Sequence, residues 1–161
     1  MASSLPPLEI QRSAPGQAWT ARGDLVVVRC ATLIVAETVR ALVTHARTRP
    51  QPAHLAVIYV LEGSVMGVPD EACRDAFVEL SREGERVFTS AAVVIPAGFA
   101  AAVVRAFVGG VRMVARARLP FEVFERLEDA DAFTRRHAAA ASTLPDARAL
   151  EDTIAALRAA G

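Results

Sequence analysis

Hydrophobic residues in this chain are grouped into short segments whose spacing alternates between the patterns of strands and helices. Three segments, 24–30, 54–61 and 90–95, are almost continuously apolar. A strand that alternates apolar and polar residues has one solvated face, whereas a continuous apolar strand is buried on both faces. We therefore expect these three segments to lie side by side in a sheet that helices cover.

Two further strands are predicted at the ends of this pattern. Residues 17–21 and the segment from Asp24 flank Arg22-Gly23, a spacing that predicts an antiparallel hairpin. A short strand, Phe121–Glu125, follows Pro120.

Helical spacing of apolar residues predicts five helices. Thr32 is placed to cap the first of them, and Pro69 to open the second beside Asp70 and Glu71. The predicted helices are 33–48, 70–85, 98–116, 128–140 and a final one that carries Leu150, Ile154 and Leu157.

The alternation of strand and helix is typical of an α/β fold with right-handed crossovers. We expect a four- to five-stranded, mostly parallel sheet with an antiparallel N-terminal hairpin strand. Residues 1–16 are interpreted as a flexible arm, 17–140 as the α/β domain, and 141–161 as an extra amphipathic helix. Its apolar stripe is buried either on its own domain or across a dimer.

Composition excludes several classes of protein. The net charge of the 161 residues is zero, which gives no global attraction to nucleic acid. Every basic residue is Arg, so a Walker A loop, a lysine Schiff base and a lysine general base are all excluded. Cys30 and Cys73 have no metal-binding spacing, and we expect free thiols in a reducing cytoplasm. The N-terminus has no signal-peptide pattern.

The stretch of eighteen uncharged residues between Arg86 and Arg105 is long enough to raise the question of a membrane span. Pro96-Ala97-Gly98 interrupts it, and a strand, a turn and a helix explain it better.

The order of these elements resembles the STAS/SpoIIAA-like group, which includes the bacterial anti-sigma-factor antagonists, and above all its shorter bacterial members. The resemblance covers about residues 17–137. Three runs carry it: Leu-Ala-Val-Ile-Tyr-Val at 55–60, Ala-Ala-Val-Val-Ile at 91–95, and Phe-Glu-Val-Phe-Glu-Arg-Leu-Glu-Asp-Ala at 121–130. It implies protein–protein regulation without a cofactor.

The loop 62–68 follows a buried strand, where open α/β sheets place ligands. Phosphorylated antagonists carry Asp-Ser-Ser-Gly here, a motif that this chain lacks. One hypothesis is a partner-facing loop, phosphorylated on Ser64; the alternative is a plain surface turn. The residues concerned are Glu62, Gly63, Ser64, Met66 and Gly67.

Enzyme and metal sites receive little support. Ser64 lacks the Gly-x-Ser-x-Gly context of a hydrolase, although Asp129, Asp131 and His137 follow in the order of that family. The three histidines lie on separate elements without metal-ligand spacing. We expect no catalytic, metal or cofactor site.

The helix 98–116 has a basic stripe. Arg105, Arg112 and Arg116 share one side, Arg118 adds a fourth charge, and no acidic residue lies between Gly98 and Pro120. Val103, Phe107 and Val114 are expected on the opposite, buried side. Such a helix meets an acidic partner or a membrane surface, or simply covers the sheet with a solvated arginine face.

Together these features indicate a non-catalytic regulatory or scaffolding module that binds a protein, a second copy of itself included. The alternative is a carrier of a small apolar or lipid-like ligand, with helix 98–116 as one wall of the pocket. A hydrolase that uses the loop 62–68 is the third hypothesis.

Overall fold

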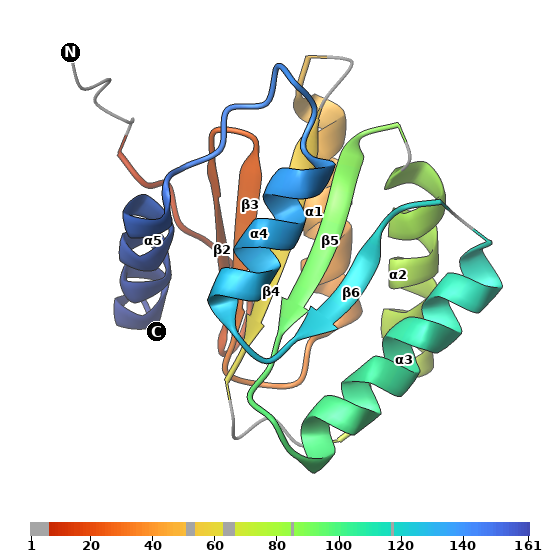
Figure 1. Ribbon diagram of the computed structural model, residues 1–161. Helices are drawn as coiled ribbons and strands as arrows, with labels where there is room; N and C mark the ends of the chain where they lie inside the picture. The colour runs from red at the N-terminus through yellow and green to blue at the C-terminus, as the bar shows by residue number, and fades with distance from the viewer. Residues whose placement is uncertain (1–6, 51–53, 63–66, 85, 117) are drawn as a thin grey trace.

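The computed structural model describes residues 7–50, 54–62, 67–84, 86–116 and 118–161, apart from the side chain of Phe99. One mixed sheet has the strand order β1-β2-β3-β4-β5-β6 (Figure 1). The strands are β1 (Gln11–Ala14), β2 (Gln17–Arg22), β3 (Leu25–Cys30), β4 (Leu55–Leu61), β5 (Phe88–Val94) and β6 (Phe121–Phe124). The helices are α1 (Ala36–Thr48), α2 (Glu71–Gly84), α3 (Phe99–Ala115), α4 (Leu127–His137) and α5 (Ala147–Ala159).

The pairing of the strands confirms the predicted α/β class. Strands β1, β2 and β3 are antiparallel neighbours, whereas β3, β4, β5 and β6 run parallel. The sheet therefore has a parallel body and an antiparallel N-terminal edge, as the hairpin at Arg22-Gly23 predicted.

The central strands are buried on both faces because helices cover both sides of the sheet. All seven residues of β4 are buried. Tyr59 and its same-face neighbours pack against α1, α2 and α3, and Ile58 and its neighbours pack against α4 and α5. A strand whose side chains enter two cores must be apolar along its whole length, which accounts for the run at 55–61.

One part of the predicted N-terminal arm is a strand. The arm was placed at residues 1–16, but Gln11–Ala14 pairs with β2 and extends the sheet to six strands. Its side chains are exposed or half-buried, so apolar spacing gave no signal for it.

The prediction that Thr32 caps the first helix is wrong. The helix begins at Ala36, and the hydroxyl of Thr32 donates to the carbonyl of Pro15. The amide of Gln17, which is 2% exposed, donates to Leu33 and accepts from Thr38. The Gln17 side chain thus makes the hydrogen bonds at the start of α1 that a capping threonine was expected to make.

The C-terminal helix docks on its own domain. Leu150, Ile154 and Leu157 are buried against the sheet face that α4 also covers. The segment before α5 is fixed to the β2–β3 turn, because Asp24 and Thr143 exchange two hydrogen bonds of 2.8 and 2.7 Å. No helix in the described residues is long and apolar enough to cross a membrane.

Two glycines give opposite predictions for the same substitution. Gly23 has φ +61°, and a Cβ there would overlap the carbonyl oxygen of Thr143. We expect Gly23→Ala to lower the free energy of unfolding by about 1–3 kcal/mol or more. Gly109 lies in α3, and a Cβ added to it would meet no atom of the chain within 4 Å, so in dilute solution, where the chain is monomeric, Gly109→Ala should raise the free energy of unfolding by up to about 1 kcal/mol. Chemical denaturation of both variants checks the pair; equal effects would contradict the described packing.

Candidate functional site

Helix α3 lies beside α2 and β6 at the edge of the molecule (Figure 1). Its buried side is formed by Ala101, Val108, Val111 and Ala115. The sequence placed Val103, Phe107 and Val114 on that side. This orientation is wrong for Val114, which is 51% exposed, while Val103 and Phe107 are half-buried. Because apolar residues occupy every side of α3 except the arginine row, helical spacing alone could not identify the side that faces the sheet.

The solvent side of α3 is apolar as well. Met113 is 75% exposed, and Ala102, Ala106 and Gly109 are exposed beside it. We call Ala102, Ala106, Gly109, Gly110, Met113 and Val114 the outer face of α3. A helix on the surface of a single domain normally carries polar residues toward water, and a helix that is apolar all round is normally buried.

The two glycines of the outer face are not explained by contacts within the chain. Close packing of another element is a common reason for glycines inside a helix, but a Cβ at Gly109 or Gly110 would meet no atom within 4 Å. Each glycine costs about 1 kcal/mol relative to alanine inside a helix. The space above them is therefore open in this structure.

A basic row borders the outer face on the side of β6. It consists of Arg105, Arg112 and Arg116, which are all exposed. Arg105 pairs with Glu125 at 2.9 Å, whereas Arg112 and Arg116 have no ion pair within the described part of the chain. Arg118, the fourth predicted residue, is exposed beyond the end of the helix.

An acidic row borders the outer face on the other side. Asp75, Glu79 and Glu83 line a groove between α2 and α3, with Val78, Val114 and one cation, Arg82, beside them. Glu79 and Glu83 also meet Arg47 of α1. Sequence reasoning missed this row as part of a site, because it comes from a different helix and only the packing of α2 on α3 brings it there.

One arginine of α2 bonds to the last turn of α3, in addition to the apolar packing of the two helices. The guanidinium of Arg82 donates to the carbonyl oxygens of Val114 and Ala115, at 3.2 and 3.5 Å. These carbonyls belong to the last turn of α3, where no next turn of helix is present to satisfy them. The contact also places the Arg82 guanidinium between the acidic row and the end of the outer face.

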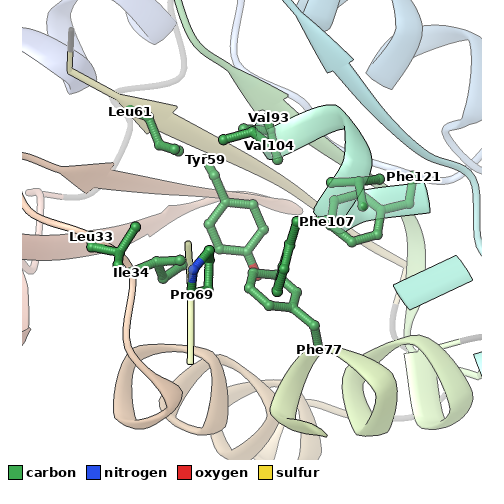
Figure 2. A pocket seen from close by; sticks show the side chains of 11 residues that line it. Leu33, Ile34, Tyr59, Leu61, Pro69, Phe77, Val93, Val104, Phe107 and Phe121 are labelled. Atoms are coloured by element: carbon green, nitrogen blue, oxygen red, sulfur yellow. The ribbon is translucent and has the colours of Figure 1, made fainter. Parts of the chain in front are cut away.

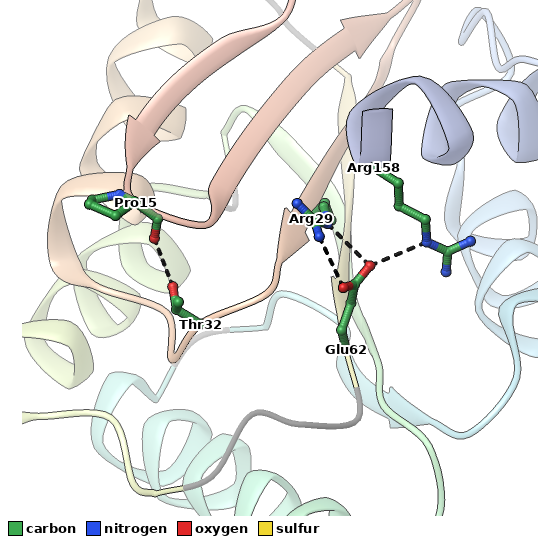
Figure 3. A network of polar contacts seen from close by, with 5 residues as sticks. All are labelled: Pro15, Arg29, Thr32, Glu62 and Arg158. Atoms are coloured by element: carbon green, nitrogen blue, oxygen red, sulfur yellow. Dashed lines mark hydrogen bonds and ion pairs between the residues drawn. The ribbon is translucent and has the colours of Figure 1, made fainter. Parts of the chain in front are cut away.

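The second predicted site, the loop 62–68, is described only at its two ends. Glu62 lies at the end of β4 and accepts hydrogen bonds from Arg29 of β3 and from Arg158 of α5, at 3.0 and 3.2 Å (Figure 3). Gly67 has φ +116°. Gly63, Ser64 and Met66 lie outside the described residues.

The guanidinium of Arg29 is the main reason why the pKa of Glu62 is lowered from its ordinary value, and Arg158 adds to the effect. The predicted partner-facing loop thus begins with a carboxylate that is already engaged inside the chain. Its contacts join the parallel body of the sheet to the C-terminal helix.

An apolar cavity of about 30 Å³ lies behind α3. Figure 2 shows the ring of Tyr59 among aliphatic and aromatic side chains that come from the sheet, α2 and α3, with Phe77 and Phe107 close to it. Tyr59 and Phe77 pack edge to face at 5.4 Å, and Phe77 and Phe107 at 5.6 Å. The cavity lies where the ligand-carrier hypothesis placed a pocket.

The residues of the hydrolase hypothesis have other contacts. Asp131 pairs with Arg135 of the same helix at 2.9 Å, and the ring of His137 packs on Phe133. The C-terminal end of α4, which carries His137, lies at the end of the sheet opposite to the end of β4 (Figure 1). Asp129 is exposed, and Ser64 is outside the described residues.

No group of three metal-ligating side chains occurs within the described ranges. Asp70, which the sequence assigned to the start of a helix, accepts a hydrogen bond of 2.8 Å from the backbone N–H of Cys73. Cys30 and Cys73 are free and buried, and burial raises the pKa of each thiol to about 12. A thiol with such a pKa is not a nucleophile at neutral pH.

Comparison with known proteins gives one likeness of fold. No family model matches the sequence, and no curated protein matches it. A solved structure that matches is that of an uncharacterized protein of the DUF3478 family from Shewanella loihica PV-4, which has a SpoIIAA-like fold. The two chains are 12% identical, with a TM-score of 0.46, over 83% of this chain and 98% of that one. This likeness is to a protein with a SpoIIAA-like fold, the group that the order of elements resembles.

The contacts of Glu62 predict a pH dependence. Its pKa is lowered in the folded state, so its ion pairs stabilise the fold above the ordinary value of 4.5 and are lost as the pH falls through the lowered value. We expect Glu62→Gln to reduce the free energy of unfolding at pH 7, and the difference from the wild type to shrink below pH 4.5. Denaturant titrations across this range test it, and a difference that is constant with pH would contradict the assignment.

Proposed function

We propose that this protein is a non-catalytic module that works by binding a protein on the outer face of α3, in a regulatory or scaffolding role. The observation that carries the proposal is that the solvent side of this helix has no polar side chain between its two rows of charge. Two buried thiols without a disulfide support a reducing compartment such as the bacterial cytoplasm.

The composition of the surface fits a protein interface. Two adjacent large apolar side chains, Met113 and Val114, are surrounded by small residues and flanked by charges. Interfaces generally have an apolar centre and a polar rim, and methionine and arginine are enriched in them. Single exposed apolar residues are ordinary on protein surfaces, but an uninterrupted apolar helix side is not.

A membrane surface fits the same face less well. An amphipathic helix that lies on an anionic membrane has a polar side rich in Lys and Arg. Here the basic row accounts for one border only, and Asp75, Glu79 and Glu83 on the other border would be repelled by anionic lipid. A partner with charges of both signs satisfies both borders, and proteins have such surfaces.

The test is a pair of variants that add the same charge on different faces. Met113→Arg places a cation in the centre of the outer face, and Ala155→Arg places one on the exposed side of α5. We expect Met113→Arg to weaken binding of a partner at least about tenfold, since a charge must then be buried in an apolar contact, and Ala155→Arg to leave it unchanged.

The measurement is the stoichiometry and affinity of the captured protein after purification from the native cell, with thermal unfolding as a check that both variants fold. A partner bound equally by Met113→Arg and the wild type would show that the outer face is not the binding surface.

The cavity behind α3 supports a second candidate function, the carriage of a small apolar ligand. Its lining is apolar, and the hydroxyl of Tyr59 has no hydrogen-bond partner in the described residues. A cavity of about 150 Å³ is needed to hold benzene, so a ligand larger than a few atoms requires α3 to move outward. This requirement makes the cavity the second candidate.

A cavity-filling variant tests this candidate. Val104 lines the cavity and is half-buried, and Val104→Phe should fill the space that a ligand would enter. We expect benzene to shift the NMR signals of the methyl groups of Val93 and Leu61 in the wild type and not in the variant. Identical spectra of the wild type with and without benzene would exclude carriage in this cavity.

A further inference from the structure

We infer that the outer face of α3 pairs with the outer face of a second copy of this chain, about a two-fold axis that runs parallel to the helix. This inference rests on the proposed function, because it names the partner of the same surface. It is carried by the arrangement of charge on the two sides of the outer face.

The two borders of the outer face are opposite in sign. On the side of β6, Arg105 and Arg112 line a groove whose other wall includes Glu122 of β6. Arg105 also pairs with Glu125, so Arg112 and Arg116 are the cations of this border that have no ion pair in the described residues. On the side of α2, Asp75, Glu79 and Glu83 line the other groove together with one cation, Arg82, so acidic side chains are in excess there. The apolar strip between them therefore separates a basic row from an acidic row.

Symmetry decides which pairing of two such faces is favourable. A two-fold axis parallel to α3 turns the second copy so that its helix runs in the same direction and its left and right borders are exchanged. The basic row of each copy then faces the acidic row of the other, and both contacts form twice in the dimer. An axis perpendicular to α3 would instead place basic row against basic row, so it is disfavoured.

The centre of the face suits the close approach of two such helices. In a parallel two-fold pair, each residue near the axis meets its own counterpart. Ala102, Ala106 and Gly110 follow at intervals of four residues along the outer face, and small residues in such a line let two helix backbones approach closely. Met113 and Val114 would then be removed from water at the end of the contact.

The same contact accounts for the retention of Gly109 and Gly110. In the isolated chain the two positions have open space above them, and alanine would be the better helix residue. In a parallel pair the backbone of the second α3 occupies that space, where an added methyl group would force the helices apart.

The first experiment measures the mass of the full chain in solution by sedimentation velocity over a wide range of concentration. We expect a reversible dimer for the wild type and for the control Ala155→Arg. Met113→Arg should raise the dissociation constant at least about tenfold, and Gly110→Leu should raise it while leaving a folded monomer. Circular dichroism and thermal unfolding verify the fold of each variant.

The second experiment reverses the charges on the two borders. Arg112→Glu should weaken the dimer, because it creates two contacts between like charges, and Asp75→Arg should weaken it for the same reason. The double variant, Arg112→Glu with Asp75→Arg, should recover dimerisation, because each new cation then faces a new anion of the other copy. In an antiparallel pair, where like rows face each other, each single variant would instead strengthen the dimer.

Three results would overturn the inference: a monomer at every concentration, a dimer that Met113→Arg leaves intact, or a double variant no better than the single ones. Failure of the inference can be told apart from failure of the proposed function. If the wild type is monomeric but Met113→Arg abolishes binding of a different protein, the outer face is a binding surface for that protein and the second copy is not its partner. If Met113→Arg changes neither dimerisation nor the binding of another protein, the inference and the proposed function are both wrong.

Discussion

The rest of the structure depends on the burial of β3, β4 and β5 on both faces. Their side chains enter two separate cores, so water must be excluded from both sides of the sheet. This requirement places α1, α2 and α3 on one side and α4 and α5 on the other. It also explains why the C-terminal helix is an integral part of the domain: without Leu150, Ile154 and Leu157, the face of β2 and β3 would be open to solvent.

Helix α3 covers the sheet with one side, and its outer face stays exposed to solvent. Its buried side covers the sheet and the small cavity around Tyr59. Its outer face has the composition of a buried surface, although within this chain nothing described covers it. The apolar strip of that face favours contact with apolar groups. The opposite charges along its two borders favour one orientation of the partner over the other. Binding of a protein, and pairing with a second copy in particular, would remove the apolar residues of the outer face from water.

Periodicity in the sequence was sufficient for the core of the fold and insufficient for its edges. The buried strands and the five helices were predicted because burial on one or two faces leaves a regular apolar pattern. Strand β1 has no such pattern, and the start of α1 is set by the buried amide of Gln17 rather than by the nearby Thr32. The basic row could be predicted because it lies on one helix. The acidic row could not, since its relation to α3 depends on how α2 packs. Val114 was misplaced because apolar residues continue around α3 on both sides of the arginine row, so their spacing does not show which of them face the sheet.

The central claim is that the outer face of α3 is covered in solution. The most direct measurement is the relaxation of the Met113 methyl signal by a soluble paramagnetic agent, with the signal assigned by Met113→Leu. The side chain is 75% exposed in the single chain. We expect strong relaxation in dilute solution and protection as the concentration rises. Strong relaxation at every concentration, and in the presence of any captured protein, would contradict the account.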